Sequence, residues 1–399
     1  MKILFVSALF PYPLYSGGQV RIFNLLKQLS SKHKITLFSF IRESQEQQYI
    51  KNISFCKRIH TIYRGQAWQP GYVLKSVFGR YPFLFATYDN ASMRNALNDE
   101  LQKNHYDLIH LEPSYVWPSL PKTEVPTVVC EHNIEHAIYE GYVRQIPFVG
   151  LRPLLYADVL KLKYWERNAW KRATHVITVS DKDKMEVSRF IAQNRISVIP
   201  NGVDIDTFSF HPQERIQKQS GPICLFVGYF GWLQNKDALR NLLDYLWPSI
   251  LKKFPQASLR VVGKRIPQNL RKKLTKQQGI LLEYVDNIHQ QYQDAHVLLA
   301  PIRIGGGTKY KILEAMATGL PVITTTIGAS GLDVEYNKEL MIADSPESTI
   351  QAIERIYTQN EFRLNLVRAA RKRIEQSYTW QHIANDLDIV WQNVYENKS

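Results

Sequence analysis

The segment from residue 295 to residue 328 constrains the fold of this chain more than any other stretch. It reads AHVLLAPIRIGGGTKYKILEAMATGLPVITTTIG. The run HVLLAPI is typical of a buried strand, and the apolar residues between positions 308 and 318 recur at helical spacing. A second apolar run, PVITTT, follows a short stop at Gly319. We therefore expect a strand, a glycine-rich turn, a helix and a second strand, in this order.

The glycine-rich turn is suited to binding an anion. Its consecutive glycines are Gly305, Gly306 and Gly307. They let backbone N–H groups approach an anion closely, and the N-terminus of the following helix carries roughly half a positive charge. Lys309 and Lys311 add positive charge, and Glu314 can hydrogen-bond the hydroxyls of a ligand. A bare βα turn with a solvated glutamate is the alternative, because a lone glycine-rich turn is a weak signal.

The start of the chain has the same organisation. KILFVSALF is followed by Gly17 and Gly18, by a helical apolar pattern over residues 20–29 and by the strand-like run ITLFSF. This order forms a βαβ unit and predicts a doubly wound parallel sheet, whose ligands bind at the carboxyl ends of the strands. We interpret the first apolar run as a buried strand and not as a signal peptide, since it is short and no small-residue cleavage site follows.

A polar cluster follows another apolar strand, in TVVCEHNIEH at residues 127–136. It contains Glu131, His132, Asn133 and Glu135. Burying such a cluster is costly unless its members have partners or a task. The position of His132 at the end of a strand favours a functional role, and a purely structural histidine is the alternative.

Length and composition limit the remaining choices. A chain of 399 residues exceeds the size at which single cores usually split, which predicts two domains. The net charge of +14 favours phosphorylated ligands or anionic lipid. No nucleic-acid-binding signature occurs, so we expect no nucleic acid partner. No apolar run approaches the ~18 residues of a membrane span. Cys56, Cys130 and Cys224 lack metal-ligand spacing. Cys130 and Cys224 lie in strand-like apolar runs, so we expect them to pack in the core of a cytosolic protein.

Two stretches of the first half suit a membrane surface or an acceptor. Residues 144–172 hold seven basic and two acidic residues on a helical pattern. Residues 67–90 are rich in aromatic residues, with Lys75 and Arg80 between them. Packed helices with solvated faces are the alternative for both stretches.

Three motifs resemble the retaining GT-B glycosyltransferases of group 1 (family 4). They are LEAMATGLPVI from residue 313, VIPNGVDxxxF from residue 198 and E-H-N-x-E from residue 131. The resemblance implies an α/β, GT-B fold: two Rossmann-like doubly wound domains facing across a cleft. Residues 1–206 would form the acceptor-side domain and residues 207–380 the nucleotide-sugar-binding domain, with a C-terminal helix at 381–399 packing back on the first.

The resemblance also implies roles for individual residues. Glu314 would hold the nucleotide ribose, and His132 would lie near the reacting sugar. Asp286, in the segment VDN, would lie near the nucleotide base. The residues implied at the donor diphosphate are Gly17, Gly18, Gly305, Gly306, Gly307 and Thr308.

The chain departs from the common family pattern at two positions. The family commonly has a glutamate where this chain has Gly306, and often an arginine where it has Tyr229, with Lys236 two residues late for the usual lysine. A branch with the pattern R-x-G-x-G-T-K-x-K-x-L-E resembles this chain more closely. We expect Lys309 and Lys311 to supply the missing positive charge during catalysis.

The expected function is transfer of a sugar, of the hexosyl type, from a nucleotide diphosphate sugar to a glycan or lipid-linked acceptor, with retention of configuration. We expect no cofactor and no metal, since no acidic pair suited to a metal stands beside the diphosphate site. The expected location is cytoplasmic, peripheral at the inner face of the membrane. The alternatives are a nucleotide-sugar-binding protein without transferase activity and a nucleotide-sugar epimerase, which would need no acceptor.

Overall fold

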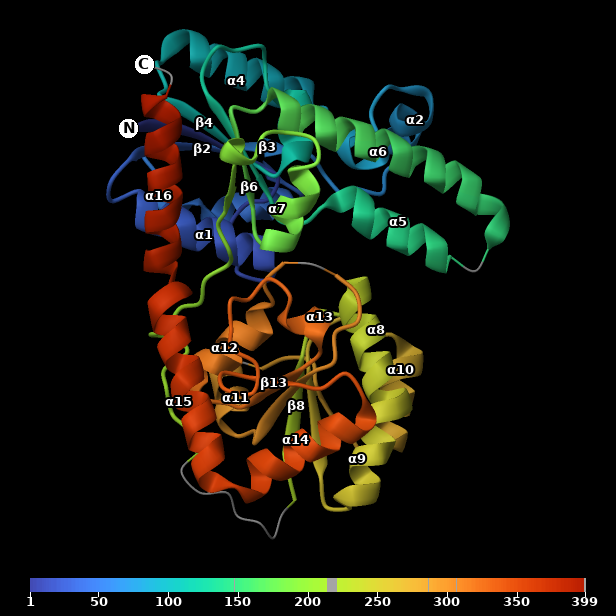
Figure 1. Cartoon of the computed structure of the whole chain (residues 1–399). Coiled ribbons are helices and arrows are strands. Elements are labelled where there is room, and N and C mark those ends of the chain that lie inside the picture. The colour runs from blue at the N-terminus through green and yellow to red at the C-terminus, as the bar shows by residue number, and fades with distance from the viewer. Residues whose placement is uncertain (147, 214–220, 286, 306, 398–399) are drawn as a thin grey trace. The chain divides into compact units, whose positions relative to one another are not determined.

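The structure, a computed structural model, describes residues 1–146, 148–213, 221–285, 287–305 and 307–397. The chain forms two compact units: Met1–Pro200 together with Ile383–Ser399, and Asn201–His382. Each unit contains one sheet, and all pairings between the described strands are parallel. This confirms the predicted architecture of two Rossmann-like units (Figure 1).

The N-terminal unit is built on a seven-stranded sheet with the order β3-β2-β1-β4-β5-β6-β7. Its strands are β1 (Lys2–Ser7), β2 (Lys34–Ile41), β3 (Arg58–Tyr63), β4 (Leu108–Glu112), β5 (Thr127–Glu131), β6 (His175–Thr178) and β7 (Ile196–Val198). Its α-helices are α1 (Gly17–Leu29), α2 (Pro70–Phe78), α3 (Phe83–Ala86), α4 (Ala91–Lys103), α5 (Glu135–Gln145), α6 (Arg152–Arg172) and α7 (Asp181–Val187). Short 3₁₀ segments are η1 (Ser44–Ile53), η2 (Ser114–Ser119), η3 (Val149–Leu151) and η4 (Gln193–Arg195).

The C-terminal unit is built on a six-stranded sheet with the order β10-β9-β8-β11-β12-β13. Its strands are β8 (Ile223–Val227), β9 (Ser258–Val262), β10 (Ile280–Leu282), β11 (Val297–Ala300), β12 (Val322–Thr324) and β13 (Met341–Ile342). Its helices are α8 (Leu233–Asn241), the π-helical η6 (Leu242–Leu246), α9 (Trp247–Lys253), α10 (Gln268–Lys276), α11 (Ile288–Gln293), α12 (Tyr310–Thr318), α13 (Thr326–Ala329), α14 (Pro346–Thr358) and α15 (Asn360–Ser377). The last helix is α16 (Trp380–Glu396), which belongs to the N-terminal unit from Ile383 onward.

The central strands of both sheets are buried. All residues of β1 except Lys2 are buried, and so are all residues of β4, β5 and β11. Strands of a parallel sheet that is covered on both faces read as continuous apolar runs, which is the pattern the sequence has here. The cysteines are also buried and unpaired, as core packing predicts.

The strand order reverses once in each sheet, between β1 and β4 and between β8 and β11. In doubly wound sheets, ligands bind at the carboxyl ends of the strands at such a reversal. The Gly17–Gly18 turn follows β1, and the glycine-rich turn follows β11. Both candidate turns therefore lie where this class of fold binds its ligands.

Some predicted helices have other bounds. One helix was expected over residues 144–172, but α5 ends at Gln145 and α6 begins at Arg152. α5 also begins inside the polar cluster, at Glu135. The helix expected from residue 308 begins at Tyr310, because the backbone of Lys309 is extended. Within the part of the chain that the structure describes, no helix combines the length and apolar character of a membrane span.

Candidate active site

The glycine-rich turn joins β11 to α12 at the reversal of the C-terminal sheet. Gly305 and Gly307 have φ values of +111° and +66°, which glycine adopts without strain. Gly306 lies outside the described residues. Lys309 is the N-cap of α12, and its Nζ donates to the carbonyl oxygen of Gly307 at 2.5 Å. The Lys309 side chain does not cap the helix, and its backbone carbonyl accepts from the N–H groups of Ile312 and Leu313.

Lys311 connects this turn to the neighbouring strand and helix. Its Nζ donates to Asn235 Oδ1 on α8 at 2.8 Å and lies 4.7 Å from the ring centre of Phe226 on β8. Burial, together with the charge of Lys309, lowers the pKa of Lys311 to about 7. A bound anion would favour the ammonium form and raise this pKa. The charge of Lys311 is thus poised to respond to a ligand.

Glu314 lies in the middle of α12 and is held by Tyr292 of α11. The Tyr292 hydroxyl donates to Glu314 Oε2 at 2.6 Å. Burial raises the pKa of Glu314, although the Tyr292 hydrogen bond and the charge of Lys311 oppose the shift. Tyr292 fixes one carboxylate oxygen, and the other makes no hydrogen bond with a described residue. The arrangement can accept a ligand hydroxyl at a fixed position.

Thr308 joins the two motifs of the C-terminal unit. The backbone N–H of Asn201 donates to Thr308 Oγ1 at 3.0 Å, and Asn201 Nδ2 donates to the Thr308 carbonyl at 3.5 Å. The Asn201–Gly202 turn and the glycine-rich turn are therefore neighbours in space, although 107 residues separate Asn201 from Thr308.

In the N-terminal unit, Glu112 is the centre of a buried polar network at the end of β4. His132 Nε2 lies 2.7 Å from Glu112 Oε1, and Arg21 Nε of α1 donates to the same oxygen at 3.0 Å. His110 Nε2 lies 3.3 Å from Oε2. Burial alone would raise the pKa of Glu112, but the hydrogen bonds from His110 and His132 and the charge of Arg21 hold it well below its usual range. Glu112 is therefore a buried carboxylate.

The glycine pair begins α1, beside His132. Ser16 caps the helix by accepting a hydrogen bond from the Gln19 N–H, and Gly17 and Gly18 form its first turn. A Cβ atom at position 18 would lie 3.4 Å from His132 Nδ1. The structure thus brings Gly18 and His132 together at the carboxyl ends of β1 and β5, the two strands on either side of β4.

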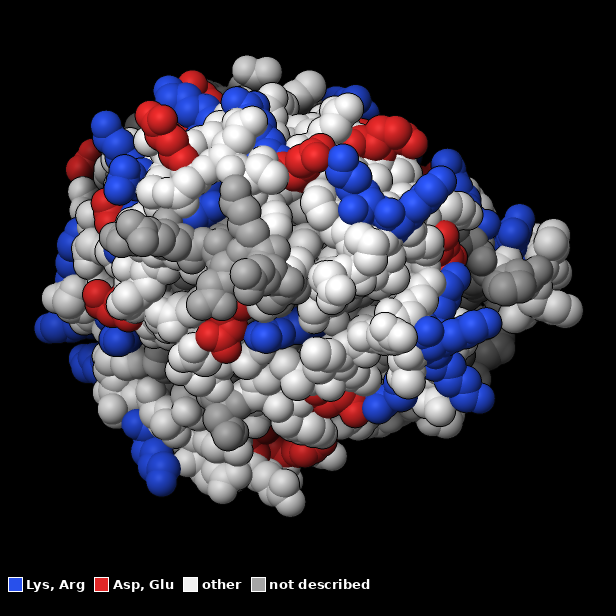
Figure 2. Space-filling view, turned by 90° about the horizontal axis from the view of Figure 1, so that it is seen from below, with Lys and Arg blue, Asp and Glu red and all other residues white. Residues whose placement is uncertain are grey.

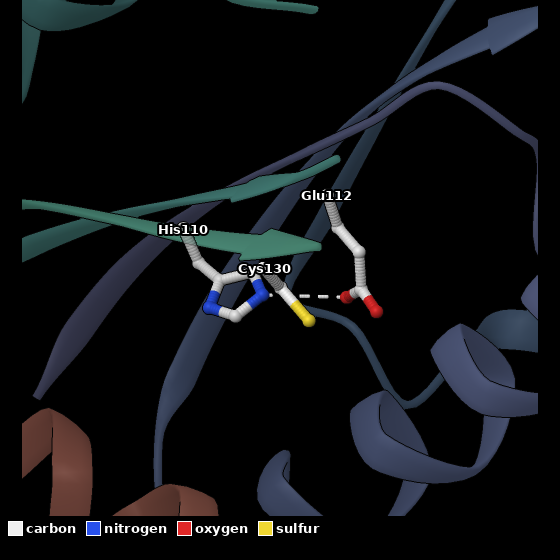
Figure 3. Close-up of side chains that lie close together, drawn as sticks. All are labelled: His110, Glu112 and Cys130. Carbon is white, nitrogen blue, oxygen red and sulfur yellow. Dashed lines mark hydrogen bonds and ion pairs between the residues drawn. The ribbon is translucent and has the colours of Figure 1, made fainter. Parts of the chain in front are cut away.

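His110, Glu112 and Cys130 lie close enough together to form a candidate metal cluster (Figure 3). Arg21, however, donates to Glu112 and lies 3.6 Å from Cys130 Sγ through Nη2. Burial also raises the pKa of Cys130, which keeps the thiol protonated. A guanidinium among the ligands and a neutral thiol are unsuited to a cation, because metal ligation requires a thiolate and repulsion is strong at this range.

A second acidic cluster lies beneath the polar segment after β5. Glu166 of α6 accepts hydrogen bonds from the N–H groups of Glu135 and His136 at 2.8 and 2.9 Å and contacts His136 Nδ1 at 2.7 Å. Trp170 Nε1 donates to Glu131 at 2.7 Å. Burial raises the pKa values of Glu131, Glu135 and Glu166 to about 8. Glu166 thus accepts from the first N–H groups of α5, and none of these hydrogen bonds involves His132.

Each unit of the chain matches a known protein family. The family described as "Glycosyltransferase Family 4" matches residues 15–207, and the family described as "Glycosyl transferases group 1" matches residues 221–359. The chain carries glycosyltransferase domains of family 4 and of group 1. The two matches correspond to the N-terminal and C-terminal units.

Relatives of this glycosyltransferase are distant in sequence and close in fold. The putative glycosyltransferase YtcC of Bacillus subtilis is 22% identical, over 100% of this chain and 94% of its own length. An uncharacterised 44.6 kDa protein in the cps region of Klebsiella pneumoniae is 22% identical, over 86% of this chain and 87% of its own length. Sucrose-phosphate synthase of Thermosynechococcus elongatus superposes with a TM-score of 0.77 at 17% identity, covering 100% of both chains. Anabaena HepE in complex with UDP-glucose superposes with a TM-score of 0.67 at 15% identity, covering 98% of this chain and 100% of that one.

Several contacts in this glycosyltransferase were not expected from the sequence. Glu112 contacts His132, and Arg21 contacts Glu112. In the C-terminal unit, Asn235 contacts Lys311 and Tyr292 contacts Glu314. No local pattern marks them, because each contact joins elements far apart in the chain. Asp286, expected near the nucleotide base, lies outside the described residues. Tyr229, at the expected arginine position, accepts a hydrogen bond from Asn235 Nδ2 through its carbonyl oxygen at 2.9 Å.

Proposed function

We propose that this glycosyltransferase transfers a hexosyl group from a nucleotide diphosphate sugar to a glycan or lipid-linked acceptor, with retention of configuration and without a metal ion. The observation that carries the proposal is the glycine-rich turn at the sheet reversal, with Lys309, Lys311 and Glu314 on the helix that follows it. UDP-glucose bound to HepE, a protein of the same fold, is consistent with a nucleotide sugar as the donor.

The C-terminal unit is proposed to hold the nucleotide diphosphate. Glu314, fixed by Tyr292, accepts hydrogen bonds from the ribose hydroxyls. The N–H groups of the turn, with Thr308, the helix dipole and the ammonium groups of Lys309 and Lys311, bind the diphosphate. As the sugar departs, negative charge develops on the diphosphate, and preorganised donors stabilise it; removal of one such donor typically lowers the rate about 10²-fold or more. These cations supply the charge that a metal ion would otherwise supply.

The N-terminal unit is proposed to contact the sugar that is transferred. His132 contacts the transferred sugar, and the N–H groups at Gly17 and Gly18 assist the donor phosphates. Asp286 is retained as a proposed neighbour of the base.

The donor site is tested by thermal unfolding with UDP, GDP, ADP and CMP. A ligand at 100 times its dissociation constant stabilises the folded state by about 2.7 kcal/mol. One diphosphate should raise the midpoint, and Glu314→Ala should abolish the shift. Glu361→Ala, an exposed glutamate of α15, is the matched control and should keep it. If no nucleotide shifts the midpoint, the donor site is refuted.

The reaction is tested with the nucleotide sugar whose nucleotide binds. NMR should show a product with the anomeric configuration of the donor sugar, formed only with an acceptor and unaffected by EDTA. Inversion of the anomeric centre refutes retention, and loss of activity in EDTA refutes metal independence. Interconversion of the donor sugar without an acceptor would instead indicate an epimerase.

We further propose that the N-terminal unit binds the surface of an anionic bilayer through the α2–α6 surface. This surface is formed by exposed apolar residues around α2 and before and within the start of α6: Trp68, Val73, Leu74, Val77, Phe78, Phe148, Val149, Leu151 and Leu154. Phe78 and Trp68 are 84% and 83% exposed. α2 lies beside α6 (Figure 1), since Lys161 Nζ donates to the Ser76 carbonyl at 2.8 Å and Ser76 Oγ donates to Asp158 at 2.7 Å.

The charges on these segments favour an anionic partner. Residues 63–88 contain no acidic residue, and residues 141–172 contain only Asp158 and Glu166. Asp158 accepts hydrogen bonds from Ser76 Oγ and the Phe83 N–H, and Glu166 is buried. By contrast, the face shown in Figure 2 carries acidic side chains among the basic ones. Arg144 pairs with Glu140, but basic residues still outnumber acidic ones on these segments. Exposed apolar side chains flanked by an excess of cations are features of an interfacial membrane site.

Sedimentation with lipid vesicles tests this surface. The protein should sediment with vesicles of phosphatidylcholine and phosphatidylglycerol, less at high salt and less with phosphatidylcholine alone. Leu74→Ser combined with Phe78→Ser should reduce binding, whereas Tyr245→Ser combined with Tyr284→Ser, both exposed on the C-terminal unit, should not. Failure to sediment with either vesicle, or self-association of the protein through the same residues, refutes the proposal.

A further inference from the structure

The hydrogen-bond network around Glu112 extends from His132 to the last helix of the chain. Trp391 of α16 donates from Nε1 to His110 Nδ1 at 3.1 Å, and His110 Nε2 lies 3.3 Å from Glu112 Oε2. The side chains of Trp391, His110 and Glu112 are completely buried. The chain of contacts therefore runs Trp391, His110, Glu112, His132.

The donors at its two ends determine where the protons of this network lie. An indole N–H only donates, so His110 Nδ1 must accept and carries no proton. The proton of the neutral His110 ring is then on Nε2, which faces Glu112. Glu112 accepts a hydrogen bond from His110 at Oε2 and hydrogen bonds from Arg21 and His132 at Oε1. A carboxylate only accepts, so His132 Nε2 must carry a proton.

We propose that Glu112 is a positioning residue that holds His132 in the Nε2–H tautomer, so that His132 Nδ1 offers a lone pair to a hydroxyl group of the substrate. Nδ1 lies on the side of Gly18, since a Cβ added at that position would come within 3.4 Å of this nitrogen. The His132 side chain is 18% exposed, whereas Glu112 is fully buried and cannot meet a substrate itself.

Arg21 completes the support of Glu112. Its Nη1 donates to the Pro200 carbonyl at 2.8 Å, in addition to the Nε contact with Glu112. The carboxylate is thus held from α1, β4 and the segment after β5, and its lone pairs are committed to fixed donors. A neutral amide in its place could not accept from all three at once.

Histidine tautomers provide a test that is independent of transfer. ¹⁵N NMR of the wild-type protein, with His132 assigned through the His132→Asn variant, should show that the neutral imidazole carries its proton on Nε2 and none on Nδ1. The Nδ1–H tautomer, or an equal mixture of the two, overturns the proposal. This measurement needs neither donor nor acceptor, so it can fail or succeed separately from the proposed transferase function.

A double-mutant cycle tests whether Glu112 acts through His132, and this part rests on the proposed function. Glu112→Gln can keep one acceptor oxygen for both Arg21 and His132, but it turns an amide N–H₂ toward His110 Nε2 and replaces a carboxylate by a weaker, neutral acceptor. It should therefore lower kcat about 10-fold, because the imidazole is held less firmly. KM for the donor should change little, because the nucleotide is held by the C-terminal unit. In the His132→Ala background, Glu112→Gln should cause no further loss of kcat.

Glu166→Gln is the matched control, since Glu166 is equally buried and contacts a different histidine, His136. It should leave kcat within a few-fold of the wild type in both backgrounds, and nucleotide binding by all variants shows that the C-terminal unit is folded. If Glu112→Gln lowers kcat equally with and without His132, Glu112 does not act through His132 and the proposal is overturned.

Discussion

At the scale of single residues, Gly202 shows how a sequence motif can be a packing requirement. A Cβ atom at this position would lie 2.8 Å from the Trp380 ring. We predict that Gly202→Ala lowers the free energy of unfolding by about 1–3 kcal/mol, the usual cost of overpacking. Urea unfolding measures it. Gly141→Ala is the control, because a Cβ there meets nothing within 4 Å and glycine in a helix interior costs about 0.5–1 kcal/mol relative to alanine. Equal stabilities for the two variants would contradict the packing explanation.

If Lys311 binds the donor diphosphate as proposed, the affinity for a diphosphate depends on pH. Its pKa is lowered to about 7 by burial and the charge of Lys309, so the free protein loses this cation as pH rises through 7. A bound anion raises the pKa, so binding takes up a proton above that pH. We predict that diphosphate affinity falls between pH 7 and pH 9. Calorimetry in buffers of different ionisation enthalpy should detect the proton uptake.

Lys311→Arg is the matched variant for this prediction, because a guanidinium stays protonated throughout the range. Its affinity should vary less with pH than that of the wild type. If both proteins show the same pH dependence, another group causes it.

At the scale of secondary-structure elements, Glu166 and its neighbours determine how the start of α5 responds to pH. Burial raises the pKa values of Glu131, Glu135 and Glu166 to about 8, above the ordinary value of 4.5. The folded state therefore binds more protons than the unfolded state between these pH values, and the stability this contributes is lost as pH rises through 8. We predict that Glu131→Gln reduces the decrease in the free energy of unfolding between pH 6 and pH 9.

Chemical unfolding at the two pH values measures this effect. The lowered pKa of Lys311 makes stability rise with pH, but this contribution is the same in the wild type and the variant and cancels in the comparison. Asp99→Asn, an exposed residue of α4, is the control and should leave the decrease unchanged. An unchanged decrease in Glu131→Gln as well would mean that these carboxyl groups titrate normally.

The elements themselves were largely predictable. Runs such as KILFVS and HVLLA, each followed by glycines and an amphipathic helix, predicted the order of strands and helices because burial on both sheet faces imposes apolar runs. The gap between α5 and α6 was missed because basic and apolar residues continue across it at helical spacing. Glu112 was missed because its partners Arg21 and His132 are 91 and 20 residues away, and only the sheet order brings β1, β4 and β5 together.

At the scale of the whole molecule, the chain ends by completing the unit in which it began. From Ile383 onward α16 belongs to the N-terminal unit. Asp388 accepts from Lys32 at 2.9 Å and contacts His33 at 2.8 Å, and Trp391 is fully buried against His110. The core of the first unit therefore includes side chains of α16.

We predict that Trp391→Ala lowers the free energy of unfolding by about 3–5 kcal/mol, the cost typical of deleting a buried tryptophan. Trp391→Phe should cost less, because it keeps most of the ring and loses the donor to His110. Unfolding curves of both variants measure the difference. Ile389→Ala, on the exposed face of the same helix, should be nearly neutral. If Trp391→Ala is as stable as Ile389→Ala, Trp391 does not stabilise the core of the N-terminal unit. Its hydrogen bond to His110 would then not be available to fix the positions of the protons between His110 and His132.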